Sequence, residues 1–152
     1  MIAVQSMGQS GVKLYGYIQD VMPGTIARGT DENGNRIETG RQYNYQVYLV
    51  APASLRITPA EVWINHKPFS ARGEAVSQTP VVFKDQKNNR ILVPRTSQRV
   101  LKIITLPFSG KSLANAKEKA ATNQLVVVYQ LKGRWYTASL TELTRLEPQE
   151  NL

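Results

Sequence analysis

The chain has 152 residues and no cysteine, and its formal net charge at pH 7 is +8. This length suits one domain that buries a core without cross-links, and the lack of thiols excludes disulfides, thiol nucleophiles and thiolate metal sites. No apolar run approaches the roughly 20 residues of a membrane-spanning helix, and residues 1–11 lack the basic start and apolar segment of a signal peptide.

Short apolar runs separated by turn residues dominate residues 12–147, which we expect to form a single domain built of β-strands. The flanking residues 1–11 and 148–152 are polar and are expected to be flexible. The first strand is expected over 12–21. In the polar stretch that follows, Asn33-Gly34 suits a type I′ hairpin turn, because both residues tolerate positive φ.

Alternation with a period of two is clearest over 43–51, where Tyr48 points away from the apolar face. Further strands are expected over 61–65, 81–83, 90–93 and 100–106, with a hairpin joining the second and third of these runs. Residues 111–122 form the one predicted helix, because they are rich in alanine and contain no Gly or Pro. Ser112 is available as its N-cap, and its thin apolar stripe predicts a surface position.

The final hairpin can be predicted residue by residue. Two apolar runs flank Lys132-Gly133, which is expected to form a two-residue turn. The resulting register opposes Tyr129 to Tyr136 on an apolar face and places Trp135 on the other face. A slip of one residue would move every apolar side chain to the wrong face, so the hydrophobic pattern strongly specifies this register.

These elements, about eight strands and one short surface helix near 111–122, indicate a mainly β fold. An antiparallel, immunoglobulin-like β-sandwich fits the count, and a Greek-key barrel of the oligonucleotide- and oligosaccharide-binding type is the alternative. In a two-sheet sandwich, the side of a strand that faces away from the core meets solvent. Tyr48 and Trp135 are therefore candidates for exposed aromatic contacts.

The basic residues are concentrated between 84 and 119, where nine Lys and Arg stand against two acidic residues. Such a block can form an anion-binding surface, although a solvated face that keeps the protein soluble is the simpler interpretation. Arg95, Arg99 and Lys102 lie at its centre and are the first candidates for anion binding. A nucleic-acid partner would use the same residues, since phosphate contacts dominate that kind of binding.

Lys111 and Ser112 are the other anion-binding candidates. They follow Gly110 after an apolar strand, which resembles the end of a phosphate-binding P-loop. The resemblance is incomplete, because Thr105 occupies the first glycine position and the chain does not alternate strands with helices. We therefore expect simple anion binding at the start of the helix rather than nucleotide hydrolysis.

No set of residues meets the requirements of a catalytic or metal site. His66 is the single histidine, and without a cysteine or a second histidine it lacks partners for a metal ion. Its neighbours Asn65 and Pro68 indicate a turn beside a strand. The serines lack the elbow motif of an activated nucleophile. We expect no enzymatic activity, no metal and no cofactor.

The sequence thus favours a non-catalytic binding or structural module that recognises a protein, an anionic glycan or another component of the cell envelope. The alternative is a nucleic-acid-binding module that uses the basic segment 84–119. Analogy with other small β-sandwiches favours a periplasmic or secreted location.

Overall fold

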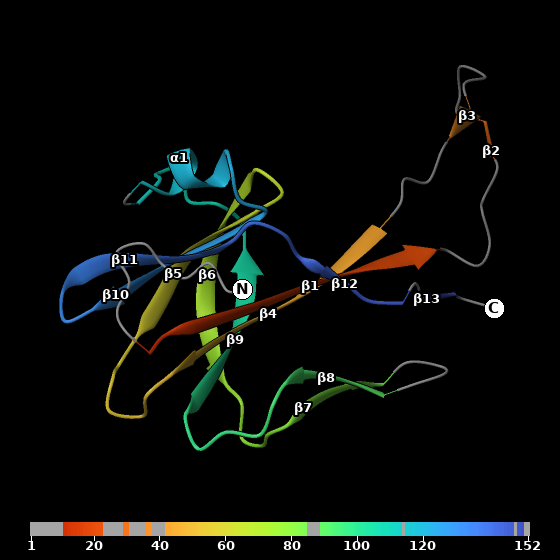
Figure 1. Ribbon diagram of the computed structural model, residues 1–152. Helices are drawn as coiled ribbons and strands as arrows, with labels where there is room; N and C mark the ends of the chain where they lie inside the picture. The colour runs from red at the N-terminus through yellow and green to blue at the C-terminus, as the bar shows by residue number, and fades with distance from the viewer. Residues whose placement is uncertain are drawn as a thin grey trace.

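A computed structural model of the protein describes residues 11–22, 29–30, 36–37, 42–84, 89–113, 115–147 and 149–150. Within these ranges the fold consists of thirteen strands and one short helix (Figure 1), which confirms the predicted mainly β class. The helix is neither long nor apolar enough to cross a membrane, and the described residues contain no other candidate span.

Nine strands join into one mixed sheet. They are β1 (Lys13–Met22), β4 (Gln42–Ala51), β5 (Thr58–Ile64), β6 (Lys67–Ala75), β9 (Arg99–Leu106), β10 (Leu125–Leu131), β11 (Arg134–Leu140), β12 (Thr144–Arg145) and β13 (Gln149–Glu150). Their order is β11-β10-β5-β6-β9-β4-β1-β12, and β13 also pairs with β1. Two ribbons accompany the sheet, β2 (Gly29–Thr30) with β3 (Arg36–Ile37), and β7 (Val81–Lys84) with β8 (Asn89–Val93).

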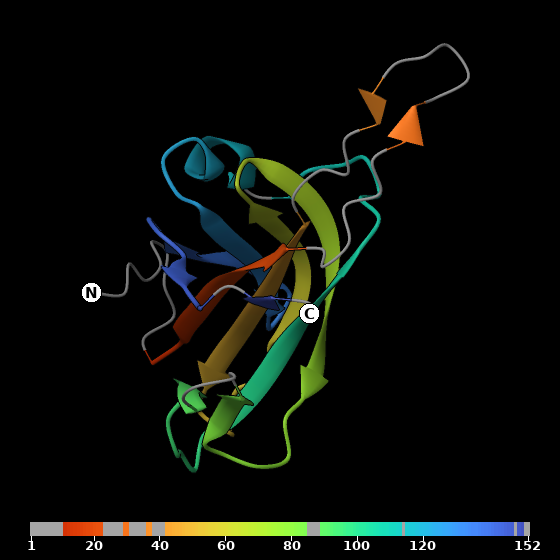
Figure 2. The ribbon, with the colours of Figure 1, turned by 90° about the vertical axis from the view of Figure 1, so that its right-hand side faces the viewer.

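The sheet curls around its main core (Figure 2), so that β1 lies close to the β10–β11 hairpin. Gly16 on β1 makes this approach possible. A Cβ atom at Gly16 would come within 2.5 Å of Leu125 Cδ2 and within 2.8 Å of Leu143 Cδ2. We call the side of the sheet that faces this core, and carries Leu49 and Val127, the inner face, and the opposite side the outer face.

The β7–β8 ribbon covers part of the outer face and forms a second core there. This core consists of Tyr17, Tyr48, Val50, Leu92, Val93, Val100 and Leu146. Tyr48 is 4% exposed, so the prediction that it is exposed is wrong. The alternation along β4 assigned its facing correctly, but the ribbon shields that face from solvent.

The helix α1 (Ala116–Ala120) covers another part of the outer face, where Ala116 and Ala120 pack against Trp63 and Val126. It is much shorter than the predicted helix over 111–122. Its N-cap is Asn115, which makes no side-chain cap hydrogen bond, so the prediction of Ser112 as the cap is also wrong. The preceding residues are tied to strand β5 instead, as described below.

The predicted hairpins are largely present. Tyr129 opposes Tyr136 in the predicted register, and positive φ angles of 52° and 76° at Lys132 and Gly133 form the predicted turn. His66 is an exposed residue of the β5–β6 turn, as predicted. The Asn33-Gly34 turn lies outside the described residues, as do 1–10 and most of 148–152. Residues 149–150, expected in a flexible tail, pair with β1.

The fold is mainly β, as predicted, but it is not clearly the antiparallel, immunoglobulin-like sandwich that the sequence suggested. The short strands β12 and β13 pair with β1 in parallel, whereas every other ladder is antiparallel among the described strands. The layer on the outer face consists of a two-stranded ribbon and one short helix. The protein is therefore a curled mixed sheet with small added elements.

Candidate binding groove along strand β1

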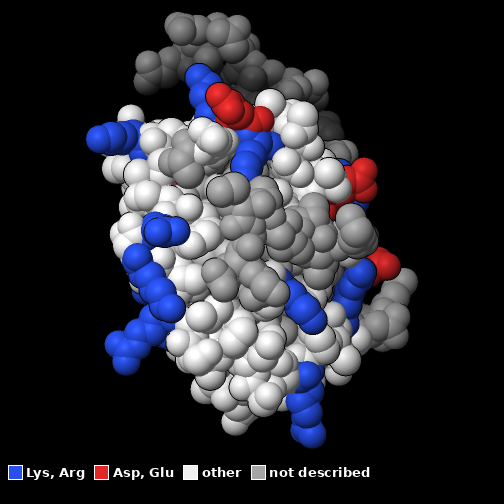
Figure 3. Space-filling model, turned by 60° about the vertical axis from the view of Figure 1, so that its left-hand side comes forward, with Lys and Arg blue, Asp and Glu red and all other residues white. Residues whose placement is uncertain are grey.

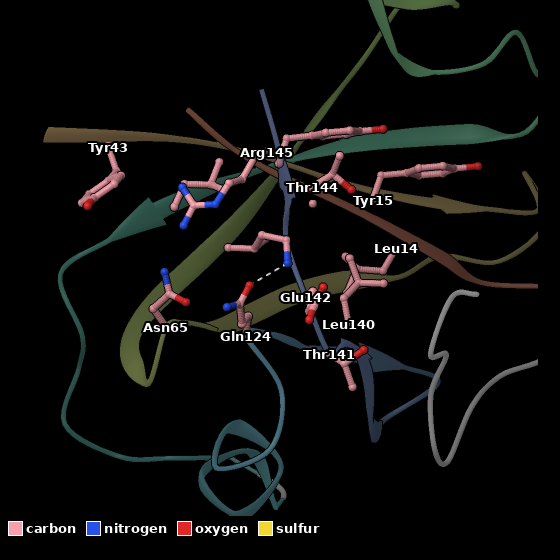
Figure 4. A pocket seen from close by; sticks show the side chains of 14 residues that line it. Leu14, Tyr15, Tyr43, Asn65, Gln124, Leu140, Thr141, Glu142, Thr144 and Arg145 are labelled. Atoms are coloured by element: carbon pink, nitrogen blue, oxygen red, sulfur yellow. Dashed lines mark hydrogen bonds between the residues drawn. The ribbon is translucent and has the colours of Figure 1, made fainter. Parts of the chain in front are cut away.

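A groove of about 940 Å³ follows strand β1 and the chain that connects β11 to β12 (Figure 4). Its lining comes from residues 14–18 and 140–145, together with Tyr43, Asn65 and Gln124. These residues belong to five separate parts of the chain that meet where the curled sheet brings its two ends together. A concave site between strand ends of a curled sheet is a common position for ligand binding.

Backbone hydrogen bonds hold one end of the groove in place. The Asn65 amide donates to the Gln124 carbonyl oxygen at 2.9 Å, and the Gln124 amide donates to the Thr141 carbonyl oxygen at 3.2 Å. The Leu143 amide donates to Gln124 Oε1 at 2.8 Å. These bonds join the β5–β6 turn, the start of β10 and the segment after β11, so the polar lining is anchored to three elements.

Two side-chain amides are each bonded to the protein through one atom only. Gln124 Oε1 accepts from Leu143, and the Nε2 group has no partner among the described residues. Asn65 Nδ2 donates to the Tyr45 hydroxyl at 3.5 Å, and its Oδ1 atom has no partner within the same residues. Gln124 Nε2 is therefore available to donate a hydrogen bond and Asn65 Oδ1 is available to accept one. A donor and an acceptor together can bind a hydroxyl group.

Aromatic rings mark the two ends of the groove, with Tyr43 on one side and Tyr15 on the other (Figure 4). Tyr43 is 41% exposed and stacks on Tyr45, with ring centroids 6.5 Å apart and planes inclined by 27°. Since Tyr45 packs against the main core, it supports the exposed ring from below. The predicted apolar face of β4 thus continues past the core at Tyr43, which is why this ring reaches solvent.

The charged residues of the groove are Glu142 and Arg145, both exposed. Neither forms an ion pair with another described residue, so both can contact a ligand. Glycoside hydrolysis needs two carboxyl groups, and Glu142 is the single carboxylate among the described lining residues. No group of metal-ligating side chains was found within the described part of the chain. The arrangement offers hydrogen bonds, ring contacts and one cation.

The structure does not gather Arg95, Arg99 and Lys102 on one surface. Lys102 pairs with Tyr48 and shares the outer face with it, whereas Arg99 pairs with Ala51 on the inner side. Alternate residues of a strand point to opposite faces, so two residues separated by three positions cannot share one. Arg95 lies in the loop before β9. Anion binding by these residues stays a prediction and would have to involve both faces.

The segment that contains Lys111 and Ser112 already donates hydrogen bonds to an anionic side chain of the protein, the carboxylate of Glu61. Glu61 is 1% exposed, and its carboxylate accepts hydrogen bonds from Trp63 Nε1 at 2.6 Å, Ser112 Oγ at 3.2 Å and the Leu113 amide at 2.9 Å. The hydroxyl and amide that a bound phosphate would need are therefore engaged. This contact also explains why the helix begins later than predicted, because the bonds to Glu61 hold Ser112 and Leu113 outside the helix.

Trp135 keeps 40% of its surface exposed on the outer face of β11, and its role in a contact stays a prediction. Sequence reasoning did not find Tyr43, Asn65, Gln124 or Arg145. The only signal for the two amides was their position immediately after and before apolar strands. No family model, curated protein or solved structure matches the chain.

Proposed function

We propose that the protein is a non-catalytic binding module that recognises a glycan in the groove along β1. The observation that supports this most directly is the pair of anchored amides, Asn65 and Gln124, beside the exposed ring of Tyr43. A sugar hydroxyl donates and accepts at once, which matches a free amide donor next to a free amide acceptor. The C–H face of a sugar ring can pack on an aromatic ring, as nucleic-acid bases do in open binding grooves.

The charge of the groove favours a glycan that carries acidic groups. Arg145 presents a planar guanidinium, which suits bidentate contact with a carboxylate or sulfate. The net charge of +8 would attract an anionic polymer from a distance. A glycan partner of the cell envelope would agree with the periplasmic or secreted location that the sequence favours.

A protein partner, bound as an extended peptide, is the second occupant that the groove could accept. Nucleic-acid binding by segment 84–119, the alternative from the sequence, would need a single cationic surface. Strand β9 instead separates Arg99 from Lys102. We therefore place the glycan first.

A glycan array probed with the purified protein tests the proposal. Tyr43→Ala should weaken binding of the retained glycans by about tenfold, the effect expected from losing one stacking contact. Trp135→Ala is the matched control, because Trp135 is 40% exposed and Tyr43 is 41% exposed. The proposal fails if no glycan is retained, or if the Trp135 variant loses binding while the Tyr43 variant keeps it.

A further inference from the structure

A second, smaller cavity of about 390 Å³ lies beside the turn between β10 and β11, whereas the groove lies at the other end of these two strands. It is lined by Leu55, Leu131, Lys132, Arg134 and Tyr136. Along the strands, about 23 Å separates Leu131 from the groove residue Gln124, and about 13 Å separates Tyr136 from the groove residue Leu140. The two sites are therefore distinct.

The β10–β11 turn fixes the backbone that carries the two cations of this cavity. Lys132 and Gly133 adopt φ angles of 52° and 76°, and Leu131 pairs directly with Arg134 across the turn. A two-residue turn of this type leaves little freedom in the relative placement of residues 132 and 134. Neither cation has an ion-pair partner among the described residues, so their charges remain available to a ligand.

The cavity has an ordered aromatic wall. Arg134 and Tyr136 are two residues apart on β11 and therefore project from the same face. The Tyr136 ring stacks on Tyr129, with centroids 5.9 Å apart, and Tyr129 is fully buried in the main core. The phenol of Tyr136 is thus held at the cavity as a third potential donor.

The electrostatic surroundings at this end of the sheet are positive. Lys13 begins β1 and Arg99 begins β9 at this end, and the exposed Arg56 directly follows Leu55 of the cavity lining. The described lining contains no carboxylate. The acidic residues of the neighbouring strands β5 and β6 are both on the outer face, where Glu61 lies opposite Val128 and is buried, and Glu74 lies opposite Lys102. Figure 3 shows the side of the molecule where this turn lies, with Lys and Arg spread across it and acidic residues confined to its upper and right margins.

We infer that this cavity binds a tetrahedral oxyanion, either sulfate or phosphate, free or carried on a larger molecule. The Arg134 guanidinium supplies a planar fork of donors, Lys132 adds a point charge, and the Tyr136 hydroxyl donates to a further oxygen. A tetrahedral anion has enough oxygens to accept from all three groups, whereas a carboxylate has two. The inference does not depend on the groove, since the two sites share no residue.

Titration of the isotope-labelled protein with inorganic sulfate and inorganic phosphate, followed by NMR, tests the inference. Backbone signals of residues 55, 131–134 and 136 should shift together and saturate. Arg134→Gln should weaken the affinity by about tenfold or more, because it removes a charge-assisted contact. Arg134→Lys should recover part of the loss, because it keeps the charge but not the fork. Lys117→Gln, which removes an equal charge from an exposed position on helix α1, should leave the affinity unchanged within about twofold.

Two results would overturn the inference. One is the absence of saturable shifts at the cavity with either anion. The other is an equal loss of affinity in the Arg134 and Lys117 variants, which would indicate general attraction to a basic protein. Tighter binding of a sulfated oligosaccharide than of inorganic sulfate, with the same response to Arg134→Gln, would support the cavity and show that the anion is carried on a chain.

Discussion

Removing the Glu61 carboxylate should destabilise the protein strongly, although the residue does not line the groove. Glu61 is 1% exposed and accepts hydrogen bonds from Trp63 Nε1, Ser112 Oγ and the Leu113 amide. Hydrogen bonds to a charged group contribute about 1.5–3 kcal/mol each, and a buried donor left without a partner costs about 1–3 kcal/mol. Ser112 is exposed and can bond to water instead, so the loss falls mainly on the other two donors.

From these values we expect Glu61→Ala to lower the free energy of unfolding by about 3–5 kcal/mol. Glu61→Gln keeps one acceptor oxygen but turns an amide N–H group toward a donor. We therefore expect it to lower the free energy of unfolding by about 2 kcal/mol. The measurement is urea denaturation followed by tryptophan fluorescence, since Trp63 contacts the carboxylate directly. Glu142→Ala, which removes an exposed carboxylate, should stay within about 0.5 kcal/mol of the original protein.

The same variants test the tether between β5 and the segment before the helix. If Glu61 holds this segment, the Leu113 amide should exchange with solvent faster in Glu61→Ala than in the original protein, by more than the global loss of stability explains. A loss below about 1 kcal/mol in Glu61→Ala would refute the reasoning, because it would mean that the three donors find equivalent partners without the carboxylate.

Three other measurements follow from the structure. Gly16→Val should lower the free energy of unfolding, measured by urea denaturation, by about 1–3 kcal/mol, because the new Cβ would overlap Leu125 and Leu143. A near-neutral result would show that the two ends of the curled sheet can separate. Burial raises the pKa of Tyr48 above its ordinary 10.0, so the folded protein retains a proton that the unfolded chain releases, and stability should fall as pH rises above about 10. Tyr48→Phe should flatten that decline, measured as the urea midpoint against pH, and an unchanged slope would contradict the assignment. Replacing Arg95, Arg99 and Lys102 together should reduce retention on heparin and on a cation exchanger equally, whereas a loss confined to heparin would restore them as one anion site.

The sequence predicted the elements whose register depends on local information. The β10–β11 hairpin is the clearest case, because the apolar pattern on both strands and the turn residues Lys132-Gly133 specify the same pairing. Strand β6 was missed because Pro68 and Gly73 interrupt its alternation. Its place is decided by pairing with β5 and β9, which supply hydrogen bonds that no local pattern reveals.

The exposure of side chains was harder to predict than their facing. Tyr48 points to the outer face, as the alternation along β4 indicates. Whether that face is exposed to solvent depends on the β7–β8 ribbon, which lies more than thirty residues later in the chain. Tyr43 is the converse case, because it lies on the apolar face of β4 but beyond the end of the core, and it is exposed. In both cases the pattern of one strand determines a direction, and the packing of distant elements determines burial.

The groove was not predictable for a related reason. Asn65 and Gln124 look like ordinary turn residues in the sequence, and they become neighbours only because β5 and β10 pair side by side. Glu61 is similar, since its partners in residues 112–113 lie about fifty positions away. Sites assembled from strand ends require the order of strands in the sheet, which composition and periodicity do not supply.

The position of the groove follows from how the protein protects the edge of its sheet. Strand β1 would leave one row of backbone groups unpaired at the end of the sheet, a feature that invites aggregation. The chain after β11 returns to cover part of that edge, where Thr144 and Arg145 pair with Tyr17 and Ile18 in parallel. A second short pairing places Gln149 and Glu150 beside Val21 and Met22, so the part of β1 before Tyr17 has no partner on this side among the described strands. The groove lies along that part, between residues 14–18 and 140–145. The same return that protects the edge therefore creates the groove and places Glu142 and Arg145 in its wall.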